Sequence, residues 1–313
     1  MTDISVSIVN TNNRELLTGC LATVQASVTP DVEVEIVVLD NASDDGSAQA
    51  VRQRFPEVRL IPQEFRAGFG ANHNTVIRAT TGRYVYVLNE DTKSEDWGFG
   101  RIVAEMDGHP NAAALGPRIV DPEGRHQRSA WRFPTPAVSL LGLPSLGQLG
   151  IAQSNGDRPR AVDWVLGAAL LLRREALEEV GLFDEEFFIY FEEVDLCLRL
   201  RRAGWEVRYF PAATVVHYES QFSANVPERR INELWRGRHR YWRKHHSRPG
   251  ARIAALATGA QYLAAAAAGT VGRDGAYRAS RRLHARNALR VNGPGLRELA
   301  DEWNRRASTQ VGN

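Results

Sequence analysis

The chain has 313 residues, of which 43% are hydrophobic and 24% are charged, and its formal net charge is +2, values that are ordinary for a soluble globular protein. Its length fits one large α/β domain with additions or two modest domains. The two cysteines, Cys20 and Cys197, lie in apolar, helix-like stretches, which excludes a disulfide framework and a cysteine-based metal site.

The first ninety residues alternate short apolar runs with segments of helical periodicity. The runs predict strands at residues 5–9, 34–39, 58–61 and 84–88, and the periodic segments predict helices at 16–24, 47–55 and 68–79. This alternation predicts right-handed βαβ units and a parallel sheet, in which ligands bind beyond the carboxyl ends of the strands. Because Asn10, Asp40 and Asp91 each follow a strand, we expect all three to line one crevice.

The remainder of the chain is less regular up to Pro227 and helical beyond it. The middle predicts a strand and turn at 116–124, a loop at 134–156, a buried strand at 163–172, a helix at 192–203, and strands at 207–209 and 214–217. The apolar stretch 251–272 is rich in alanine and is interrupted by Arg252 and Gln261. It predicts a helix that packs on protein or touches a membrane surface rather than one that spans a membrane.

The net charge conceals an uneven distribution of charge along the chain. From Glu228 to the end there are 18 Lys and Arg residues and 6 Asp and Glu residues, a balance of +12, whereas the preceding residues have a balance of −10. A basic C-terminal region indicates an anionic partner such as membrane headgroups, a lipid-linked diphosphate or nucleic acid. The alternative is a solvated basic helix that packs on the acidic part of the chain.

The first residues lack the basic, apolar and small-residue sections of a signal peptide. Together with the sparse cysteines, this favours a reducing, cytoplasmic location. We also expect peripheral contact with the inner face of the cell membrane through the basic C-terminal helices.

The most informative short motif is Asn89-Glu90-Asp91, which follows the apolar run 84–88 directly. Carboxylates at the end of a buried strand are costly unless a cation meets them. A divalent metal that holds a sugar-nucleotide diphosphate would be such a cation, and a solvated polar turn is the alternative.

Six motifs occur in a fixed order along the chain: IVNT at 8–11, VLDNASDDGS at 38–47, GFGANHN at 68–74, LNEDT at 88–92, FFIYFEEVDL at 187–196 and VH at 216–217. Together they resemble the family 2 glycosyltransferases, and within them the bacterial rhamnosyltransferase-like branch. The resemblance covers about the first 245 residues. It implies an α/β, GT-A (Rossmann-like) nucleotide-sugar-binding fold with a mixed, mainly parallel sheet over residues 1–227. The donor half would extend to about residue 116 and the acceptor half would begin at about 117, with a basic helical extension over 228–313.

The resemblance also implies where a nucleoside-diphosphate sugar binds. Asp40 would accept hydrogen bonds from the nucleobase or ribose, unless it only forms an Asx turn before the next helix. Gly68 and Gly70 would let the backbone approach the ligand and open a helix whose free N–H groups face anions. The predicted donor-binding residues are Asn10, Thr11, Asp40, Asn41, Gly68, Gly70, Asn74, Asn89 and Arg240.

For the metal, Asp91 matches the last acid of the family's D-x-D pattern, whereas Asn89 replaces its first acid. Oxygen ligands of this kind suit Mg²⁺ or Mn²⁺. His217 matches a histidine that completes the metal site in some relatives, although a lone histidine is more often structural.

For catalysis, inverting transfer needs a carboxylate that takes the proton of the acceptor hydroxyl. The family usually has Glu-Asp at the start of the helix predicted at 192–203, and the second acid is the base. Here that acid is Glu193, which is one methylene longer than aspartate. Glu192 and Asp195 are the other candidates, and favourable interaction with the helix dipole is the alternative reading of all three acids. Trp164 and Tyr190 are candidates for stacking on sugar faces, and a purely structural place in the core is the alternative.

The resemblance thus implies a metal-dependent inverting glycosyltransferase, and it points to dTDP-L-rhamnose as the donor. The acceptor would be a saccharide hydroxyl in cell-envelope polysaccharide synthesis, with a polyprenyl-diphosphate-linked saccharide among the candidates. The departures at Asn89 and Glu193 leave a catalytically silent nucleotide-sugar-binding or scaffolding protein as the alternative. Because no nucleic-acid-binding module accompanies the basic segment 236–246, we expect no nucleic-acid partner.

Overall fold

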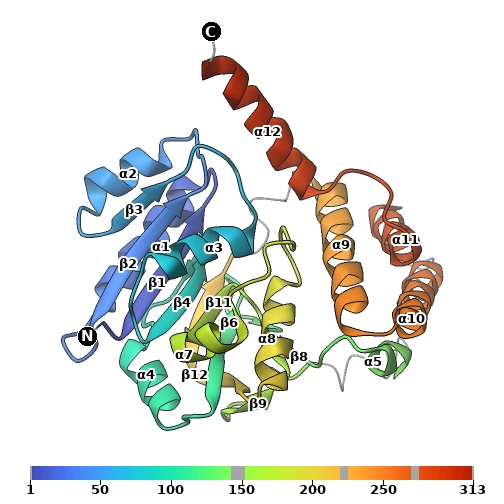
Figure 1. Ribbon diagram of the computed structural model, residues 1–313, viewed down its shortest axis with the longest axis horizontal. Helices are drawn as coiled ribbons and strands as arrows, with labels where there is room; N and C mark the ends of the chain where they lie inside the picture. Colours follow the sequence, from blue (N-terminus) through green and yellow to red (C-terminus); the bar gives the residue numbers. More distant parts are fainter. Residues whose placement is uncertain (1, 142–151, 219–224, 269–274, 312–313) are drawn as a thin grey trace.

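The computed structural model describes residues 2–141, 152–218, 225–268 and 275–311. Within these residues a ten-stranded mixed sheet forms the centre of the molecule, and four long helices from the C-terminal part lie beside it (Figure 1). The strands of the main path follow the order β3-β2-β1-β4-β11-β6-β12-β5.

The first half of the sheet is parallel, as predicted. Neighbouring strands β1 and β2 place Asn10 opposite Asp40, and the pairing of β1 with β4 places Val9 opposite Asn89. The polar ends of three strands therefore meet at one edge of the sheet, which confirms the expected topology. The elements are β1 (Ile4–Asn10), α1 (Arg14–Ala26), β2 (Val34–Asp40), α2 (Ser47–Arg54), β3 (Arg59–Pro62), α3 (Phe69–Arg78) and β4 (Tyr84–Asn89).

The second half contains both strand directions. Strand β11 (Ala169–Arg173) runs antiparallel to β4 and to β6 (Ala112–Val120), and β12 (Glu206–His217) runs parallel to β6. The mixed, mainly parallel sheet expected from the sequence is thus confirmed. The smaller strands are β5 (Thr92–Lys93), β7 (His126–Gln127), β8 (Ala130–Trp131), β9 (Arg160–Val162) and β10 (Trp164–Val165), and the helices are α4 (Phe99–Asp107), α5 (Pro136–Leu141), α7 (Arg174–Val180) and α8 (Glu192–Arg202).

Several predicted boundaries in this half are wrong. The run 163–172 is not one strand, because β10 pairs with β8 in a separate small sheet while β11 lies in the main sheet. The strands predicted at 207–209 and 214–217 are one strand, β12, which has an irregularity between Phe210 and Thr214. Helices α4 and α7 were not predicted. The loop predicted at 134–156 includes α5, and its residues 142–151 lie outside the described part.

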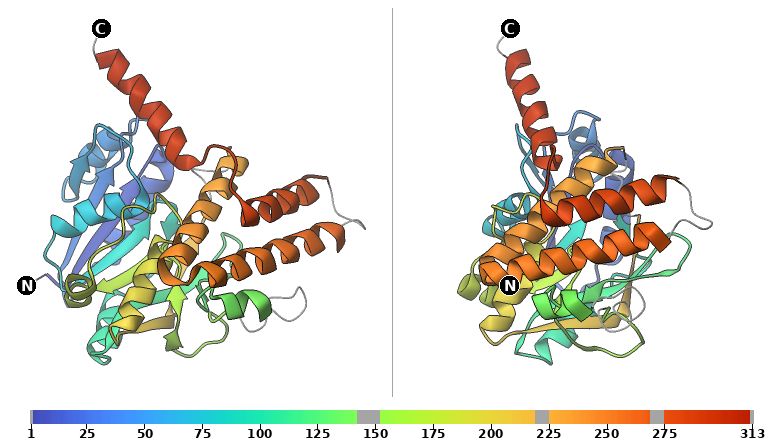
Figure 2. Two further views of the ribbon diagram at one scale, coloured as in Figure 1. Left: turned by 45° about the vertical axis from the view of Figure 1, so that its right-hand side comes forward. Right: turned by 90° about the vertical axis from the view of Figure 1, so that its right-hand side faces the viewer.

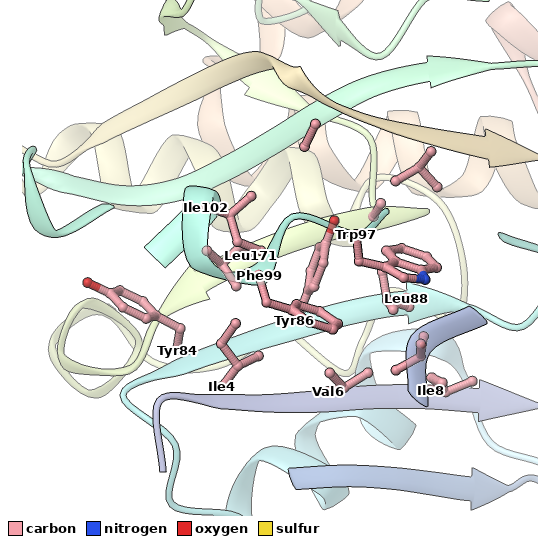
Figure 3. Packing of buried hydrophobic residues seen from close by; sticks show 14 of the residues in the cluster. Ile4, Val6, Ile8, Tyr84, Tyr86, Leu88, Trp97, Phe99, Ile102 and Leu171 are labelled. Carbon is pink, nitrogen blue, oxygen red and sulfur yellow. The ribbon is translucent and has the colours of Figure 1, made fainter. Parts of the chain in front are cut away.

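Alternating side chains of the central strands build the core on one face of the sheet (Figure 3). Ile4, Val6 and Ile8 of β1 lie next to Tyr86 and Leu88 of β4, and all five are fully buried. Burying each such side chain contributes roughly 1.5–3 kcal/mol. The strand ends that carry the polar residues are therefore held by a rigid, close-packed support.

The C-terminal helices are α9 (Pro227–His245), α10 (Arg248–Ala268), α11 (Gly275–Leu289) and α12 (Leu296–Val311). Helix α9 is amphipathic and buries Trp235, Tyr241 and Trp242. Helices α10 and α11 lie side by side, α10 also packs against α5, and α12 extends toward the C-terminus (Figure 2). Among the helices of the described segments, none combines the length and apolar character needed to cross a bilayer.

Candidate active site

A cavity of about 620 Å³ opens beyond the carboxyl ends of β1, β2 and β4. Its wall combines the strand ends with the start of α8, the end of β12 and Ala300 of α12. The predicted site residues in its wall are Thr11, Asn41, Asn89, Asp91, Glu192, Glu193 and His217.

Asn10 and Asp40 lie directly behind this wall and bond to each other. The Asn10 amide donates to Asp40 Oδ1 at 3.3 Å and to the Ser43 hydroxyl at 3.1 Å, while Asp40 Oδ2 accepts the Ser43 N–H at 3.1 Å. Asp40 therefore does form a turn after its strand. Asn41 belongs to the cavity wall itself and donates a hydrogen bond to the Thr11 hydroxyl at 3.0 Å.

Gly68, Gly70 and Asn74 face the loop before α8 instead of the cavity. A Cβ at Gly68 would collide with the carbonyl oxygen of Phe188. A Cβ at Gly70 would lie 2.9 Å from the Cβ of Phe183, whose backbone also bonds to Asn74. Close approach of the Phe188 backbone accounts for Gly68, and all three residues support the loop before α8. Their direct contact with the donor stays a prediction.

Asp91 and His217 meet inside the cavity. Asp91 follows β4 and His217 ends β12, and the pairing of His217 with Thr92 brings them together. Asp91 Oδ1 lies 3.3 Å from His217 Nε2, and both residues are buried. Within the described residues, Asp91 Oδ1 makes no hydrogen bond and no group of three His, Cys, Asp or Glu side chains forms a complete metal site. A carboxylate oxygen and an imidazole nitrogen that face each other suit a divalent cation whose other positions a ligand fills.

The two residues before Asp91 also lie in the cavity wall. Glu90 accepts a hydrogen bond from the Asn13 amide at 2.8 Å. Burial, reinforced by the charge of Asp91, raises the pKa of Glu90 to about 8. Asn89 donates its backbone N–H to the Ala168 carbonyl at 2.9 Å, which ties the end of β4 to the residue before β11.

The loop before α8 has an unusual backbone. Tyr190 and Phe191 have φ values of 72° and 75°, which non-glycine residues rarely adopt. Gly237 of α9 lies directly beneath, because a Cβ there would collide with the Tyr190 carbonyl oxygen. The Phe191 ring packs against Tyr241, also of α9, with a centroid separation of 5.8 Å. Helix α9 therefore holds this loop in the conformation that turns the start of α8 toward the cavity.

We predict that Gly237→Ala destabilises the protein by about 1–3 kcal/mol and lowers its catalytic rate, because the new methyl group must displace Tyr190. Chemical denaturation and steady-state kinetics measure the two effects. Gly275→Ala in α11 is the matched control, since its Cβ meets no atom of the described chain within 4 Å. Equal stability and activity of the two variants would contradict the supporting role of Gly237.

Glu192 and Glu193 are buried at the start of α8, and each has one carboxyl oxygen without a hydrogen-bond partner among the described residues. Burial raises the pKa of Glu193 to about 7. Burial and the charge of Glu193 raise the pKa of Glu192 well above its ordinary value. A carboxylate that titrates near neutrality is suited to general-base chemistry.

Asp195 lies outside the cavity with no exposed surface. Lys244 and His245 of α9 each lie 2.7 Å from its Oδ1, and Arg199 lies 2.8 Å from its Oδ2. Although burial opposes the shift, these hydrogen bonds and charges lower the pKa of Asp195 to about 2. In this position Asp195 links α8 to α9, and a catalytic role for it stays a prediction.

Arg240 also lies elsewhere than expected. It borders a second cavity and forms an ion pair with Glu186, so it does not line the cavity that contains Asp91.

Sequence reasoning missed Arg66 and its contact with α12. The Arg66 guanidinium lies in the cavity wall, 4.3 Å above the Trp303 ring. The Arg66 backbone exchanges two hydrogen bonds with the side chain of Asn304, at 2.7 and 3.1 Å. Two nitrogens of Arg66 are buried without a hydrogen-bond partner in the described chain. No local signal links residues 238 positions apart.

An aromatic pair also lines the cavity. Trp131 of β8 and Trp164 of β10 stack with centroids 4.5 Å apart and an interplanar angle of 24°. The sequence singled out Trp164 but not Trp131, whose short strand has no periodic pattern.

Comparison with known sequences gives one family and several relatives. The model of the family described as Glycosyl transferase family 2 matches residues 5–181. The N-acetylglucosaminyl-diphospho-decaprenol L-rhamnosyltransferase of Mycobacterium tuberculosis is 36% identical over 224 residues, which cover 64% of this chain and 72% of that protein. Rhamnosyltransferase WbbL of Escherichia coli is 25% identical over 197 residues, which cover 60% and 74%.

Among solved structures, the mannosyltransferase PcManGT of Pyrobaculum calidifontis, in complex with GDP-Man and Mn²⁺, has a TM-score of 0.57. It is 18% identical, and the match covers 98% of this chain and 84% of that one. GalNAc-T7 with UDP, GalNAc and Mn²⁺ has a TM-score of 0.60 at 18% identity, and the match covers 91% and 54%. These likenesses confirm the expected GT-A fold.

Proposed function

The chain belongs to glycosyltransferase family 2, in its rhamnosyltransferase-like group, and we propose that it transfers a sugar from a nucleoside diphosphate to a saccharide hydroxyl, with a divalent metal and with inversion. One observation carries the proposal: the Asp91–His217 pair and the unpartnered carboxyl oxygen of Glu193 belong to the wall of the same cavity. A metal-held diphosphate and a base are the two parts that a single displacement at the anomeric carbon requires.

Asp91 and His217 would hold Mg²⁺ or Mn²⁺. When bound, the ion supplies positive charge that stabilises the departing diphosphate. The Mn²⁺ in the two similar structures supports this assignment. Asp91 would bind the metal directly, while Asn89 would contact the donor from the wall of the cavity.

The nucleotide would bind at the ends of β1 and β2. Thr11 and Asn41 offer polar groups in the cavity, and the backbone N–H of Asn41 donates to the Asn10 carbonyl at 2.8 Å. We keep Asn10 and Asp40 among the proposed donor-binding residues. We add Arg66 to the donor-binding residues, since its spare N–H groups suit a nucleobase carbonyl or a phosphate oxygen. The names of the two rhamnosyltransferase relatives favour dTDP-L-rhamnose as the donor.

On the acceptor side, Glu193 would take the proton of the attacking hydroxyl in its ionised form. The stacked Trp131–Trp164 pair offers an apolar surface to the saccharide. The name of the mycobacterial relative favours a lipid-linked acceptor and hence a role in cell-envelope polysaccharide synthesis.

We infer that a GT-A domain ends at about residue 227 and is followed by the basic helical extension. The domain would have a donor half to about residue 116 and an acceptor half beyond it. Two contacts link the basic helical extension to both halves. Asn304 bonds to Arg66 on the donor side, and Gly237 supports Tyr190 on the acceptor side. We infer that the extension is needed for a functional site.

A thermal-stability screen of nucleotide sugars tests donor and metal together. We expect dTDP-L-rhamnose to stabilise the protein in the presence of Mn²⁺ or Mg²⁺, by about 2.7 kcal/mol at a concentration of 100 times its Kd. Equal stabilisation by the donor with and without the metal would contradict the assignment of Asp91 and His217 as metal ligands. Binding without turnover of any donor would favour the catalytically silent alternative.

Peripheral membrane contact is proposed for the hairpin of α10 and α11. Exposed positions of α10 form an apolar strip that includes Ile253, Leu256 and Leu263. The exposed arginines of α11, among them Arg282 and Arg286, match the charge of anionic headgroups. The occupant of this surface would be the inner face of the cell membrane.

We predict that the double variant Leu256→Asp/Leu263→Asp binds vesicles of anionic phospholipid at least about tenfold more weakly than wild type, because each buried leucine contributes roughly 1.5–3 kcal/mol. Vesicle co-sedimentation measures the change. Val28→Asp, at an exposed apolar position in the loop after α1, is the control. Unchanged binding of the double variant would contradict the membrane contact.

A further inference from the structure

A second cavity, of about 550 Å³, lies between α9, the loop before α8 and the segment that joins α11 to α12. Its wall is strongly basic. The arginines in it are Arg236, Arg240, Arg243, Arg290 and Arg297, whereas its carboxylates are Glu186 and Glu233. The cavity wall therefore carries three more positive charges than negative ones.

The positive charge is only partly neutralised by the protein. Arg236 pairs with Glu298 at 2.6 Å, and Arg240 pairs with Glu186. Arg243 and Arg290, in contrast, have no side-chain hydrogen bond or ion pair with any other described residue. Burial, and the charges of Arg243 and Arg297, lower the pKa of Arg240. Like charges held together in a concave wall favour a multiply charged anion.

This cavity shares a wall with the active site. The Phe188 residue borders both cavities, so the loop before α8 lies between them. Gly237, which supports Tyr190, lines the basic cavity as well. An anion bound here would therefore lie one loop away from Glu193. It would also be distinct from the donor diphosphate, which the proposed function assigns to Asp91 and His217.

The rim of the basic cavity is apolar. Leu289 lines the cavity and is 61% exposed. Its side chain would lie 4.0 Å from a Cβ added at Gly259 of α10, which places it beside the helix that carries Leu256 and Leu263. Those two leucines lie one turn to either side of Gly259 and are 60% and 56% exposed. A charged cavity thus continues into an exposed apolar strip.

We propose that the basic cavity binds the diphosphate of a polyprenyl-diphosphate-linked saccharide acceptor. The guanidinium groups hold the diphosphate, the saccharide extends past Phe188 toward Glu193, and the lipid chain follows Leu289 onto α10. This assignment rests on the proposed transfer function and specifies how its acceptor is recognised. It gives Arg240, predicted to bind the donor, a place on the acceptor side.

Isothermal calorimetry with farnesyl diphosphate in detergent micelles tests the cavity without any turnover. We expect farnesyl diphosphate to bind wild type at least about tenfold more tightly than inorganic pyrophosphate, and farnesol not to bind, because both the charge and the chain contribute. Arg243→Gln/Arg290→Gln should weaken farnesyl diphosphate binding about 10²-fold, since each lost charge-assisted contact costs about tenfold. Arg306→Gln, at an exposed position further along α12, is the charge-matched control and should bind like wild type.

Equal affinity for pyrophosphate and farnesyl diphosphate would overturn the assignment in favour of a general anion site. Unchanged binding in the double variant would place the diphosphate elsewhere, and tighter binding of an RNA oligonucleotide that the double variant loses would replace the lipid with nucleic acid. Metal-dependent donor binding, measured in the same samples, should be unchanged in the double variant. A wild type that binds farnesyl diphosphate but no nucleotide sugar would contradict the proposed transfer function and not the diphosphate site.

Discussion

Replacing Glu193 by glutamine is expected to lower the transfer rate about 10³-fold, which is the usual contribution of a general base. The amide keeps the shape of the side chain but cannot take a proton from the acceptor hydroxyl. Donor affinity should stay within about twofold of wild type, because the proposed nucleotide and metal contacts involve other residues. Single-turnover transfer assays and calorimetric titration with the donor measure the two quantities separately.

Glu192→Gln is the matched control, because it changes the neighbouring carboxyl group in the same buried helix start. We expect a smaller loss of rate than in Glu193→Gln. Full activity of Glu193→Gln together with an inactive Glu192→Gln would move the base to Glu192. Asp195→Asn should act mainly on stability, because its carboxylate is enclosed by Arg199, Lys244 and His245.

The raised pKa of Glu193 also predicts the pH dependence of transfer. Since the base must be ionised and its pKa is about 7, the rate should fall by about tenfold for each pH unit below 7. The pH profile of kcat/KM measures this limb. A profile that stays flat down to pH 5 would contradict Glu193 as the base.

The raised pKa of Glu193 also makes the free energy of unfolding depend on pH. The folded protein binds a proton at Glu193 more tightly than the unfolded chain does, so stability is highest below the unfolded pKa of 4.5 and falls as pH rises through about 7. Glutamine cannot ionise and avoids this loss. Denaturant unfolding at pH 8 should therefore show Glu193→Gln to be more stable than wild type, by about 1–3 kcal/mol.

Replacing Asp91 by asparagine is expected to weaken metal-dependent donor binding about 10²-fold, because it removes the carboxylate that faces His217 in the cavity. The loss should appear as a higher metal requirement in donor titrations, since an amide oxygen is a weaker ligand than a carboxylate for Mg²⁺ or Mn²⁺. Donor binding without metal should hardly change.

His217→Ala should weaken metal-dependent donor binding in the same way. Glu90→Gln should have a smaller effect, because Asn13 holds Glu90 beside the Asp91–His217 pair. If Asp91→Asn kept the wild-type metal dependence, Asp91 would not be a ligand. If only Glu90→Gln lost it, the ligand would be Glu90.

The first half of the fold was predictable because its signals are local. Apolar runs such as 34–39 and 84–88 end in polar residues, and parallel pairing then brings Asn10, Asp40 and Asn89 to one edge. The pairing of Asp91 with His217 came from the order of motifs, since the two residues are far apart in sequence. Charge counting found the basic C-terminal region but could not show that its arginines enclose a cavity.

The features of the site that could not be predicted depend on contacts between segments that are distant in the sequence. Nothing near Asp195 reveals that α9 supplies Lys244 and His245 as partners of its carboxylate. Positive φ values at Tyr190 and Phe191 leave no trace in the sequence, because these residue types are ordinary strand and core formers. Gly68 and Gly70 gave a real signal of close approach, but the approaching group is a loop of the same chain.

The proposed inverting transfer requires a metal-held donor and Glu193 to meet the acceptor saccharide in one cavity, and analysis of the product tests this most directly. Purified protein would be incubated with dTDP-L-rhamnose, Mn²⁺ and an N-acetylglucosaminyl-diphospho-polyprenol, and the product examined by NMR. We predict a rhamnosylated lipid whose anomeric configuration is opposite to that of the donor, formed only with metal and not by Glu193→Gln. Retained configuration, or metal-dependent donor binding without transfer to any acceptor tested, would contradict this function.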